Sequence, residues 1–231
     1  GGASCATRAR RLNENAEIVI FERGDNVSYA NCGLPYFVGG AIAKEESLTV
    51  ASPGFLRARF AIDVRVRSEV VGIDPAAKKV RVREREGREY EESYDKLVLA
   101  PGASAKTFGW GGEGVFTLRD VRDATGLSSY IREHGVKTAL VAGGGFIGVE
   151  TAENLARIGV DVTLAEFQPQ LLPPLDPEMA VPVAEELVKN GINVRTGTGV
   201  KSVEKSKDGL KVVFSDDTTA DFGIVVLALG V

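Results

Sequence analysis

The chain has 231 residues, of which 44% are hydrophobic and 26% are charged, a composition typical of a soluble globular protein. Its formal net charge of -4 argues against a nucleic acid as the main partner, because a phosphate backbone attracts basic surfaces. No apolar run approaches the roughly 18 residues that a membrane-spanning helix needs. Two cysteines, Cys5 and Cys32, are too few for a disulfide framework and favour a reducing, cytoplasmic location.

The first part of the chain predicts a helix and then a strand. The helix is expected over residues 3–12, and a buried parallel strand over residues 16–21 is closed by Glu22. Residues 28–40, SYANCGLPYFVGG, predict a loop that leads into a short helix over residues 33–38.

Residues 62–99 change character, because valine alternates with arginine or lysine. Such alternation is typical of a half-exposed antiparallel sheet. Turns are expected at Asp74-Pro75 and at Glu86-Gly87, and the apolar run KLVLA over residues 96–100 predicts the last strand of this region.

From about Val115 onward, strands alternate with helices, which predicts a parallel sheet with right-handed crossovers. Strands are expected over residues 138–142, 161–165, 192–195, 201–205, 210–214 and 224–229, and helices over residues 149–158 and 177–190. The sequence therefore predicts an α/β fold with two Rossmann-like domains, parallel sheets and inserted antiparallel strands. We expect an FAD-binding domain over residues 1–113 and an NADH-binding domain over residues 114–231.

The first half resembles a shortened copy of the second half. Gly2 precedes Glu22 by 20 positions, and Gly148 precedes Glu166 by 18 positions, with a helix and a strand between them in each case. This spacing indicates a duplicated strand–helix–strand unit. The chain also starts without methionine and stops just after an expected strand, so we expect a fragment that lacks the first strand of the first copy.

Residues 143–148, GGGFIG, fit the pattern G-x-G-x-x-G between an expected strand and an expected helix. Gly143 would make the turn, Gly145 would admit a pyrophosphate beside the helix N-terminus, and Gly148 would let the helix pack closely. Glu166 ends the next strand, where a carboxylate can accept hydrogen bonds from a ribose diol and repels a 2′-phosphate. NADH is therefore favoured over NADPH, and an ordinary glycine turn is the alternative.

Cys32 precedes a short expected helix, whose dipole would favour the thiolate. No second cysteine lies within five residues, so a redox role requires a small thiol, a peroxide oxygen or another protein. A buried, inert thiol is the alternative. Cys5 is expected to pack inside the first helix. His134, the single histidine, is expected at a helix end, which gives little support to a histidine base or a zinc site.

Five segments together carry a resemblance to one protein family. They are SYANCGLPYFVGG (28–40), YDKLVLAPGA (94–103), VFTLRD (115–120), GGGFIGVE (143–150) and VVLALGV (225–231). They resemble the flavin-dependent pyridine nucleotide–disulfide oxidoreductases, and the run N-C-G-L-P-Y is most similar to the single-cysteine branch. That branch contains coenzyme A-disulfide reductases, NADH-dependent persulfide reductases, NADH oxidases and NADH peroxidases.

The resemblance implies a set of site residues, with Cys32 as the catalytic residue beside the flavin. FAD would be bound by Gly2, Glu22, Arg23, Val70, Ala100, Pro101, Gly102, Ala103 and Arg119. NADH would be bound by Gly143, Gly145, Phe146, Ile147, Gly148, Glu150, Glu166, Leu175 and Gly230, with Phe146 as an aromatic gate. Coenzyme A would contact Ser4, Arg8, Arg11, Ser28 and Asn31. Phe60, next to Arg59, stands where the family has a lysine, which departs from the coenzyme A pattern.

The implied activity passes electrons from NADH through FAD to Cys32 and reduces coenzyme A disulfide or a related persulfide, so the expected partner is a small-molecule disulfide. An NADH oxidase or peroxidase that uses a cysteine sulfenic acid is one alternative, and a non-catalytic flavin redox sensor is another. The family's C-terminal dimerisation domain has no counterpart in these residues. By resemblance, the full-length protein is expected to be a homodimer.

Overall fold

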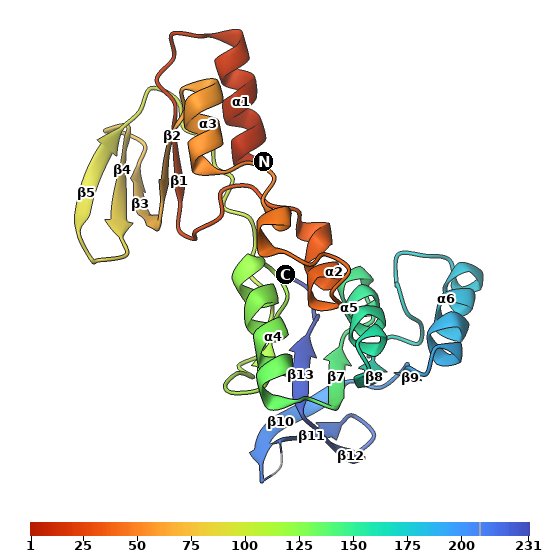
Figure 1. The fold of residues 1–231 in the computed structure, drawn as a ribbon. Coiled ribbons are helices and arrows are strands. Elements are labelled where there is room, and N and C mark those ends of the chain that lie inside the picture. Colours follow the sequence, from red (N-terminus) through yellow and green to blue (C-terminus); the bar gives the residue numbers. More distant parts are fainter. Residues whose placement is uncertain (208) are drawn as a thin grey trace. The chain divides into compact units, whose positions relative to one another are not determined.

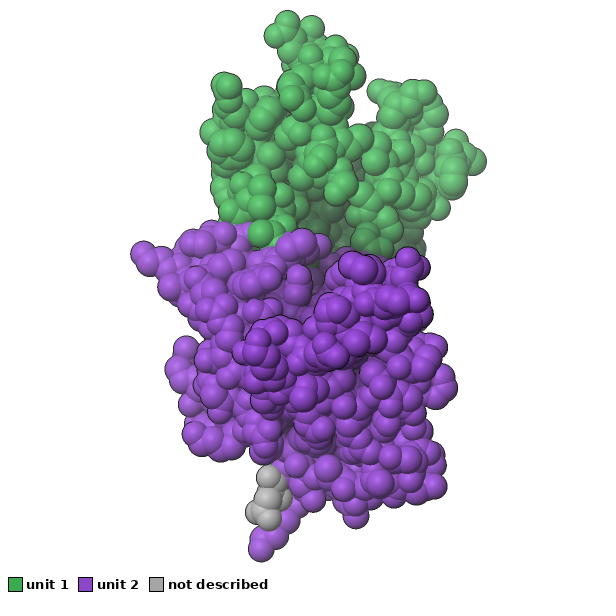
Figure 2. Space-filling model, turned by 90° about the vertical axis from the view of Figure 1, so that its right-hand side faces the viewer, with its two compact units in different colours: residues 1–30, 49–102 green, residues 31–48, 103–231 purple. Residues whose placement is uncertain are grey.

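The computed structural model describes residues 1–207 and 209–231 (Figure 1). These residues form two compact units, which Figure 2 shows in separate colours. Unit 1 consists of residues 1–30 and 49–102, and unit 2 of residues 31–48 and 103–231. This division differs from the expected boundary at 113/114, because Asn31–Leu48 and residues 103–113 both belong to the second unit. The binding roles expected for the two domains remain predictions.

Unit 1 combines a short parallel sheet with an antiparallel one. Its elements are α1 (Gly2–Leu12), β1 (Val19–Glu22), α3 (Pro53–Phe60), β2 (Asp63–Val66), β3 (Ser68–Asp74), β4 (Lys79–Glu84) and β5 (Glu89–Ser93). Strands β1 and β2 pair in parallel, and β3, β4 and β5 form an antiparallel sheet. The helices bury Ala6 and Leu56 against Ile62 and Val64.

Two strand predictions in unit 1 need correction. The strand expected over residues 16–21 is shorter, at Val19–Glu22, and half-exposed, because β2 is its single partner among the described residues. The run over residues 62–74 does not form one antiparallel strand. It divides at Arg67, whose φ of 56° breaks the extended backbone, so that β2 joins β1 in parallel while β3 enters the antiparallel sheet.

The strand expected over residues 96–100 is absent, and that prediction was wrong. Leu97, Val98 and Leu99 are 38%, 61% and 68% exposed and belong to no described strand. An apolar run adopts strand geometry when a neighbouring strand completes its hydrogen-bond ladder. No strand in the described part of unit 1 pairs with this run.

Unit 2 is built on a five-stranded parallel sheet in the order β6-β13-β7-β8-β9, beside an antiparallel sheet of β10, β11 and β12. Its strands are β6 (Val115–Phe116), β7 (Thr138–Ala142), β8 (Asp161–Ala165), β9 (Asn193–Arg195), β10 (Val200–Ser206), β11 (Gly209–Phe214), β12 (Thr219–Phe222) and β13 (Ile224–Leu227). Its helical segments are η1 (Asn31–Gly33), α2 (Leu34–Val38), η2 (Glu45–Leu48), α4 (Val121–His134), α5 (Phe146–Arg157) and α6 (Pro177–Lys189).

Unit 2 follows the sequence-based prediction closely. Strands β7 and β8 begin and end at the expected residues, and α6 ends one residue early. Helix α5 begins at Phe146 rather than at residue 149, directly after the glycine turn. Together with the antiparallel strands, these elements confirm the α/β fold with parallel sheets. In the described part of the chain, no helix has the length and apolar character needed to cross a membrane.

The two units repeat one order of elements: helix, strand, helix, strand and then a three-stranded antiparallel sheet. In unit 1 this order is α1, β1, α3, β2 and β3–β5, and in unit 2 it is α5, β8, α6, β9 and β10–β12. The repeat agrees with the duplication indicated by the two glycine–carboxylate pairs. It also extends beyond them into the antiparallel sheets.

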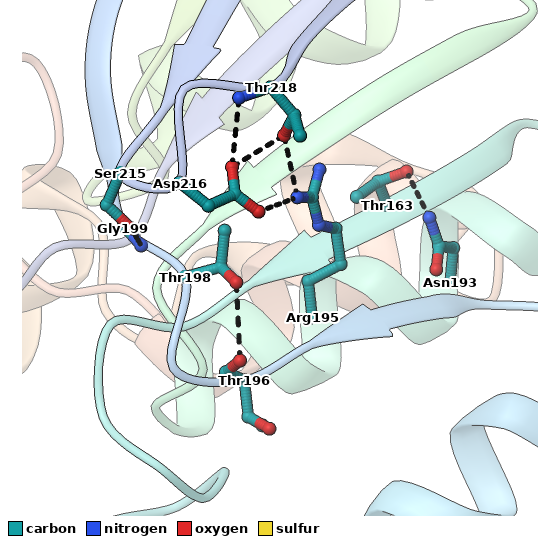
Figure 3. A network of polar contacts seen from close by, with 9 residues as sticks. All are labelled: Thr163, Asn193, Arg195, Thr196, Thr198, Gly199, Ser215, Asp216 and Thr218. Carbon is teal, nitrogen blue, oxygen red and sulfur yellow. Dashed lines mark hydrogen bonds and ion pairs between the residues drawn. The ribbon is translucent and has the colours of Figure 1, made fainter.

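An arginine occupies the same place in both copies. In unit 2, Arg195 of β9 donates to Asp216 Oδ2 at 2.8 Å and to Thr218 Oγ1 at 2.9 Å (Figure 3). Its guanidinium also lies 4.1 Å from the ring centre of Phe214. In unit 1, Arg65 of β2 donates to Glu92 Oε2 at 2.5 Å. Each arginine therefore connects a parallel strand to the antiparallel sheet of its own unit.

Candidate functional site

The glycine turn of unit 2 joins β7 to α5 through very close backbone contacts. Gly143 has a φ of 109°, and a Cβ atom at this position would lie 2.3 Å from the Ala228 carbonyl oxygen. A Cβ atom at Gly148 would lie 1.8 Å from the Gly143 carbonyl oxygen. Helix α5 thus packs directly on the turn, as the motif predicted, and glycine is needed at both positions.

Gly145 leaves open space at the start of α5. A Cβ atom there would meet nothing within 4 Å, and no side chain caps the helix. An uncapped helix N-terminus with room beside its backbone suits a pyrophosphate, because its amide groups and dipole favour negative charge. The turn therefore fits the phosphates of a dinucleotide.

Glu166 follows β8 with its carboxylate fixed over the turn. The side chain is 9% exposed. Its Oε2 accepts the Gly144 amide at 2.6 Å, and its Oε1 accepts the Gln168 amide at 2.6 Å. A carboxylate oxygen has a second lone pair, so both atoms can still accept a hydroxyl group. This arrangement fits a ribose diol.

The other residues expected at the NADH site also lie in unit 2. Phe146 and Ile147 are exposed at the start of α5, 57% and 43% respectively. Burial, and then the charge of Glu153, raises the pKa of the half-buried Glu150 on the same helix. The Gly230 carbonyl accepts the Lys106 amide at 2.9 Å, and the Leu175 amide donates to Leu172 at 2.8 Å.

In unit 1, the expected FAD residues repeat part of this geometry. Gly2 opens α1, where no side chain caps the helix, and a Cβ atom there would lie 3.4 Å from Ala100 Cβ. Glu22 ends β1, and its Oε1 accepts the Gly24 amide at 2.7 Å. The other expected FAD residues of unit 1 are exposed, namely Arg23, Val70, Ala100, Pro101 and Gly102. A helix that begins with glycine, followed by a strand that ends in a carboxylate, fits a second dinucleotide.

Two expected FAD residues lie in unit 2 instead. Ala103 is its first residue after the crossing from unit 1, and Arg119 precedes α4. The Arg119 amide donates to Asp123 Oδ2 at 2.8 Å, and the same oxygen accepts the Thr117 hydroxyl at 2.7 Å. The expected FAD residues thus belong to both compact units.

Cys32 is an exposed thiol in η1, the short turn before α2. The expected helix over residues 33–38 is therefore nearly correct, with Cys32 two residues before its first α-helical residue. Exposure removes the alternative of a buried, inert thiol. Cys5 is also exposed, which contradicts its expected packing role: α1 buries Ala6 and turns Cys5 outward.

The residues expected to contact coenzyme A are divided between the units. Ser4, Arg8 and Arg11 are exposed on one face of α1, at intervals of four and three residues, and Ser28 also lies in unit 1. Asn31, beside Cys32, lies in unit 2. Arg11 lines a groove of about 570 Å³ together with Arg59 and Phe60.

Several residues of the site region escaped the sequence-based prediction. Arg10 of α1 is held by the carbonyls of Phe60 at 2.7 Å, Glu14 at 2.6 Å and Ala61 at 2.9 Å. Asn154 of α5 is buried against Gly39 at the end of α2. The contacts of Arg10 with Phe60 and Ala61 and of Asn154 with Gly39 have no local sequence signal, because they join segments that are distant in the chain. His134 ends α4 as predicted, and the described residues contain no cluster of three His, Cys, Asp or Glu side chains that could hold a metal ion.

The glycine turn, the open helix N-terminus and the buried carboxylate define a dinucleotide-binding α/β protein. The whole chain, residues 1–231, matches the family described as pyridine nucleotide-disulphide oxidoreductase. The chain belongs to this family, as its motifs predicted.

Known relatives and solved structures resemble the chain over its full length. The coenzyme A disulfide reductase of Staphylococcus haemolyticus (strain JCSC1435) is 37% identical over 231 residues, which are 100% of this chain and 52% of that protein. Reduced Bacillus anthracis CoADR-RHD matches with a TM-score of 0.95 and 39% identity, over 100% of this chain and 42% of that one. The NAD-dependent persulfide reductase from A. fulgidus matches with a TM-score of 0.93 and 33% identity, over 100% and 44%. The chain thus spans about half the length of the curated relatives it matches.

Proposed function

We propose that the whole protein is a flavoprotein reductase that passes electrons from NADH through FAD to Cys32 and reduces coenzyme A disulfide or a related persulfide. Its family, and the names of a coenzyme A disulfide reductase and a persulfide reductase among similar proteins, support this proposal. The observation that carries it is the exposure of Cys32 on a segment that packs on α5, the helix that begins at the glycine turn.

For NADH, the proposed contacts are the residues of the turn and of α5. The amides at the start of α5 would bind the pyrophosphate, and Glu166 would accept the ribose hydroxyls with its remaining lone pairs. Its negative charge disfavours the 2′-phosphate of NADPH. Phe146, exposed at the helix start, would cover the nicotinamide site and exclude water.

For FAD, the proposed contacts are the start of α1, Glu22 with Arg23, Val70, the segment 100–103 and Arg119. The fit rests on the close contact of Gly2 in α1 with Ala100 and on the carboxylate that ends β1. When bound, FAD would supply the two-electron relay between nicotinamide and disulfide.

The proposed role of Cys32 is that of a nucleophile toward the disulfide. Its thiolate attacks one sulfur of coenzyme A disulfide, so that a mixed disulfide with Cys32 forms and one coenzyme A thiolate leaves and takes up a proton. Two electrons that originate from NADH then break the mixed disulfide. A second coenzyme A thiol leaves, and the Cys32 thiolate is restored. An exposed thiol at the entry to α2 is accessible for both steps.

The proposed substrate contacts are Ser4, Arg8, Arg11, Ser28 and Asn31. Coenzyme A carries several phosphate charges, for which guanidinium groups are suitable donors. The basic face of α1 borders a groove lined by Arg11, Arg59 and Phe60, in which such a phosphate group could be bound. We further propose that the whole protein is a homodimer and is located in the cytoplasm. Size-exclusion chromatography with light scattering would test the first point, and cell fractionation the second.

The test compares the two exposed cysteines in the full-length enzyme. Cys32→Ser is expected to lower NADH-driven release of coenzyme A thiol at least 100-fold, because serine cannot form the mixed disulfide. Flavin reduction by NADH, followed as bleaching of flavin absorbance, is expected to persist in this variant. Cys5→Ser is the matched control and is expected to behave like the wild type.

Unchanged thiol release in Cys32→Ser would refute the proposed function. Mass spectrometry of the denatured, unreduced protein gives an independent measurement. A coenzyme A adduct on Cys32 that dithiothreitol removes supports the proposal. A single added oxygen that a sulfenic-acid reagent traps would instead indicate an oxidase or peroxidase.

A further inference from the structure

Helix α2 attaches the Cys32 segment to helix α5. Both helices belong to unit 2, and α2 packs on α5 and on α4, as Figure 1 shows. Leu34, Pro35 and Val38 of α2 are buried in this contact region. Cys32, two residues before α2, remains exposed. The position of the thiol therefore depends on how α2 is held.

Gly39 brings the end of α2 into direct contact with Asn154 of α5. A Cβ atom at Gly39 would lie 2.3 Å from Oδ1, 2.7 Å from Cβ and 2.9 Å from Cγ of Asn154. The three nearest atoms all belong to this one side chain. Gly39 also caps α2, since its amide donates to the Pro35 carbonyl at 2.9 Å. Any larger residue at position 39 would push α2 away from α5.

Asn154 contributes an unusual polar group to this contact. Its side chain is 0% exposed, and its Nδ2 donates to the Glu150 carbonyl at 2.8 Å. Its Oδ1 has no hydrogen-bond partner among the described residues. A buried acceptor without a partner is costly, and an apolar side chain would avoid that cost. A buried asparagine between helices is known to favour one register over others.

The oxygen of Asn154 lies close to the backbone of Gly39. The Cβ position of a substituted residue lies along one of the two Cα–H bonds of glycine, and Oδ1 is the atom nearest to that position. Contacts of a Cα–H group with an oxygen recur where helices approach closely. The contact restricts the position of α2 along α5. Displacement by one residue in one direction would bring Val38 against the asparagine, and displacement in the other would bring Gly40, whose φ of 74° differs from the -77° of Gly39.

We propose that Asn154 and Gly39 are positioning residues, which fix the Cys32 segment on α5 in the register that the disulfide step requires. This inference rests on the proposed function. Helix α5 starts with Phe146 at the glycine turn and reaches Asn154 eight residues later, about 12 Å along its axis. One helix therefore contains both Phe146, at the proposed nicotinamide site, and Asn154, which contacts the segment that carries Cys32.

The experiment uses the full-length enzyme with the variant Gly39→Ala and measures the two half-reactions separately. Flavin reduction by NADH is expected to stay within twofold of the wild type, because the turn is unchanged. Disulfide reduction by the reduced enzyme is expected to slow at least tenfold. In steady-state turnover, kcat is expected to fall and the KM for NADH to fall with it, so that kcat/KM for NADH stays within twofold of the wild type. In parallel, the rate of Cys32 alkylation by iodoacetamide is measured against Cys5 of the same molecule and is expected to change at least threefold.

Two further variants separate positioning from general damage. Gly39→Ala combined with Asn154→Gly removes the atoms that the new methyl group would meet, so disulfide reduction is expected to recover to within threefold of the wild type. Asn154→Ala alone adds no atoms and is expected to slow disulfide reduction a few fold, and it decides the question if Gly39→Ala does not fold. Gly126→Ala on α4 is the matched control, since a Cβ atom there meets nothing within 4 Å.

Equal loss of both half-reactions together with a lower Tm, or unchanged disulfide reduction and alkylation in every variant, overturns the inference. Failure of the double variant to restore disulfide reduction also overturns it. The proposed function fails by a different result, namely wild-type enzyme that NADH does not reduce or Cys32→Ser enzyme that still releases coenzyme A. The alkylation ratio of Cys32 to Cys5 needs no turnover, so it tests the positioning in either case.

Discussion

The two units make the same close contact near the start of a helix. A Cβ atom at Gly2 would lie 3.4 Å from Ala100 Cβ in unit 1, and one at Gly148 would lie 3.4 Å from Ala228 Cβ in unit 2. In each unit, a glycine near the start of a helix faces an alanine that follows an apolar run. The repeat therefore preserves the packing of the helix start as well as the order of elements.

The two copies differ in what surrounds that contact. In unit 2, the apolar run before Ala228 is β13, which pairs with β6 and β7. In unit 1, the run before Ala100 is exposed and irregular. The carboxylates differ accordingly, because Glu166 is buried and accepts two backbone amides, whereas the half-buried Glu22 accepts one from Gly24. The same pattern of glycine, helix, strand and carboxylate is therefore more buried in unit 2, where β13 has a neighbouring strand on each side.

The largest expected effect comes from the glycine turn of unit 2. We expect Gly143→Ala to lower the free energy of unfolding by about 3 kcal/mol, because an alanine cannot adopt the φ of 109° without strain and its Cβ would meet the Ala228 carbonyl. Gly2→Ala is expected to change it by less than about 0.5 kcal/mol, since its Cβ would make an ordinary contact.

Urea unfolding of the full-length protein, followed by circular dichroism, measures both glycine variants. NADH binding by isothermal titration is expected to be lost in Gly143→Ala and retained in Gly2→Ala. Equal destabilisation by the two substitutions would show that the helix starts are equally constrained, contrary to the comparison of the two units.

An intermediate effect is expected at the two carboxylates. Glu166→Gln replaces one acceptor oxygen by an amide group that faces a backbone amide, so it is expected to cost about 2 kcal/mol. Glu22→Gln can keep its one backbone hydrogen bond through the remaining oxygen and is expected to cost less than about 1 kcal/mol. Thermal unfolding measures the difference, and a larger cost at Glu22 than at Glu166 would contradict it.

The sequence alone predicted the parts of the fold whose partners lie nearby. Strands β7 and β8 and the turn between β7 and α5 were predicted closely, because apolar runs, glycines and a carboxylate follow one another within thirty residues. The run over residues 96–100 was wrongly predicted as a strand, although it resembles Ile224–Leu227 in composition. The two runs differ in their neighbouring strands, which local sequence does not show.

The candidate site was predictable in part for the same reason. The pattern of glycines and Glu166 identifies a dinucleotide turn from local spacing, and the geometry of the turn agrees with it. The contact between Gly39 and Asn154 joins positions that are more than a hundred residues apart, and nothing in the segment 28–40 that contains Gly39 indicates Asn154 as its partner. Packing of α2 on α5 creates this contact, so it appears only once the helices are placed.

The smallest expected effect concerns Glu150, a carboxylate in the first turns of α5 that has no counterpart in α1. Glu150 stands two residues after Gly148, where α1 has Ser4 two residues after Gly2. Burial, together with Glu153, raises the pKa of Glu150 above its ordinary value of 4.5. The protonated carboxyl is thus favoured in the folded state, and the stability it contributes is present below pH 4.5 and is lost as the pH rises through the raised value. Glu150→Gln has no charge to lose. It is therefore expected to exceed the wild type in stability near neutral pH by no more than about 0.5 kcal/mol, with the difference vanishing in acid. Thermal unfolding of both proteins from pH 4 to pH 8 tests this expectation. A stability difference that grows in acid would show that the pKa of Glu150 is lowered rather than raised.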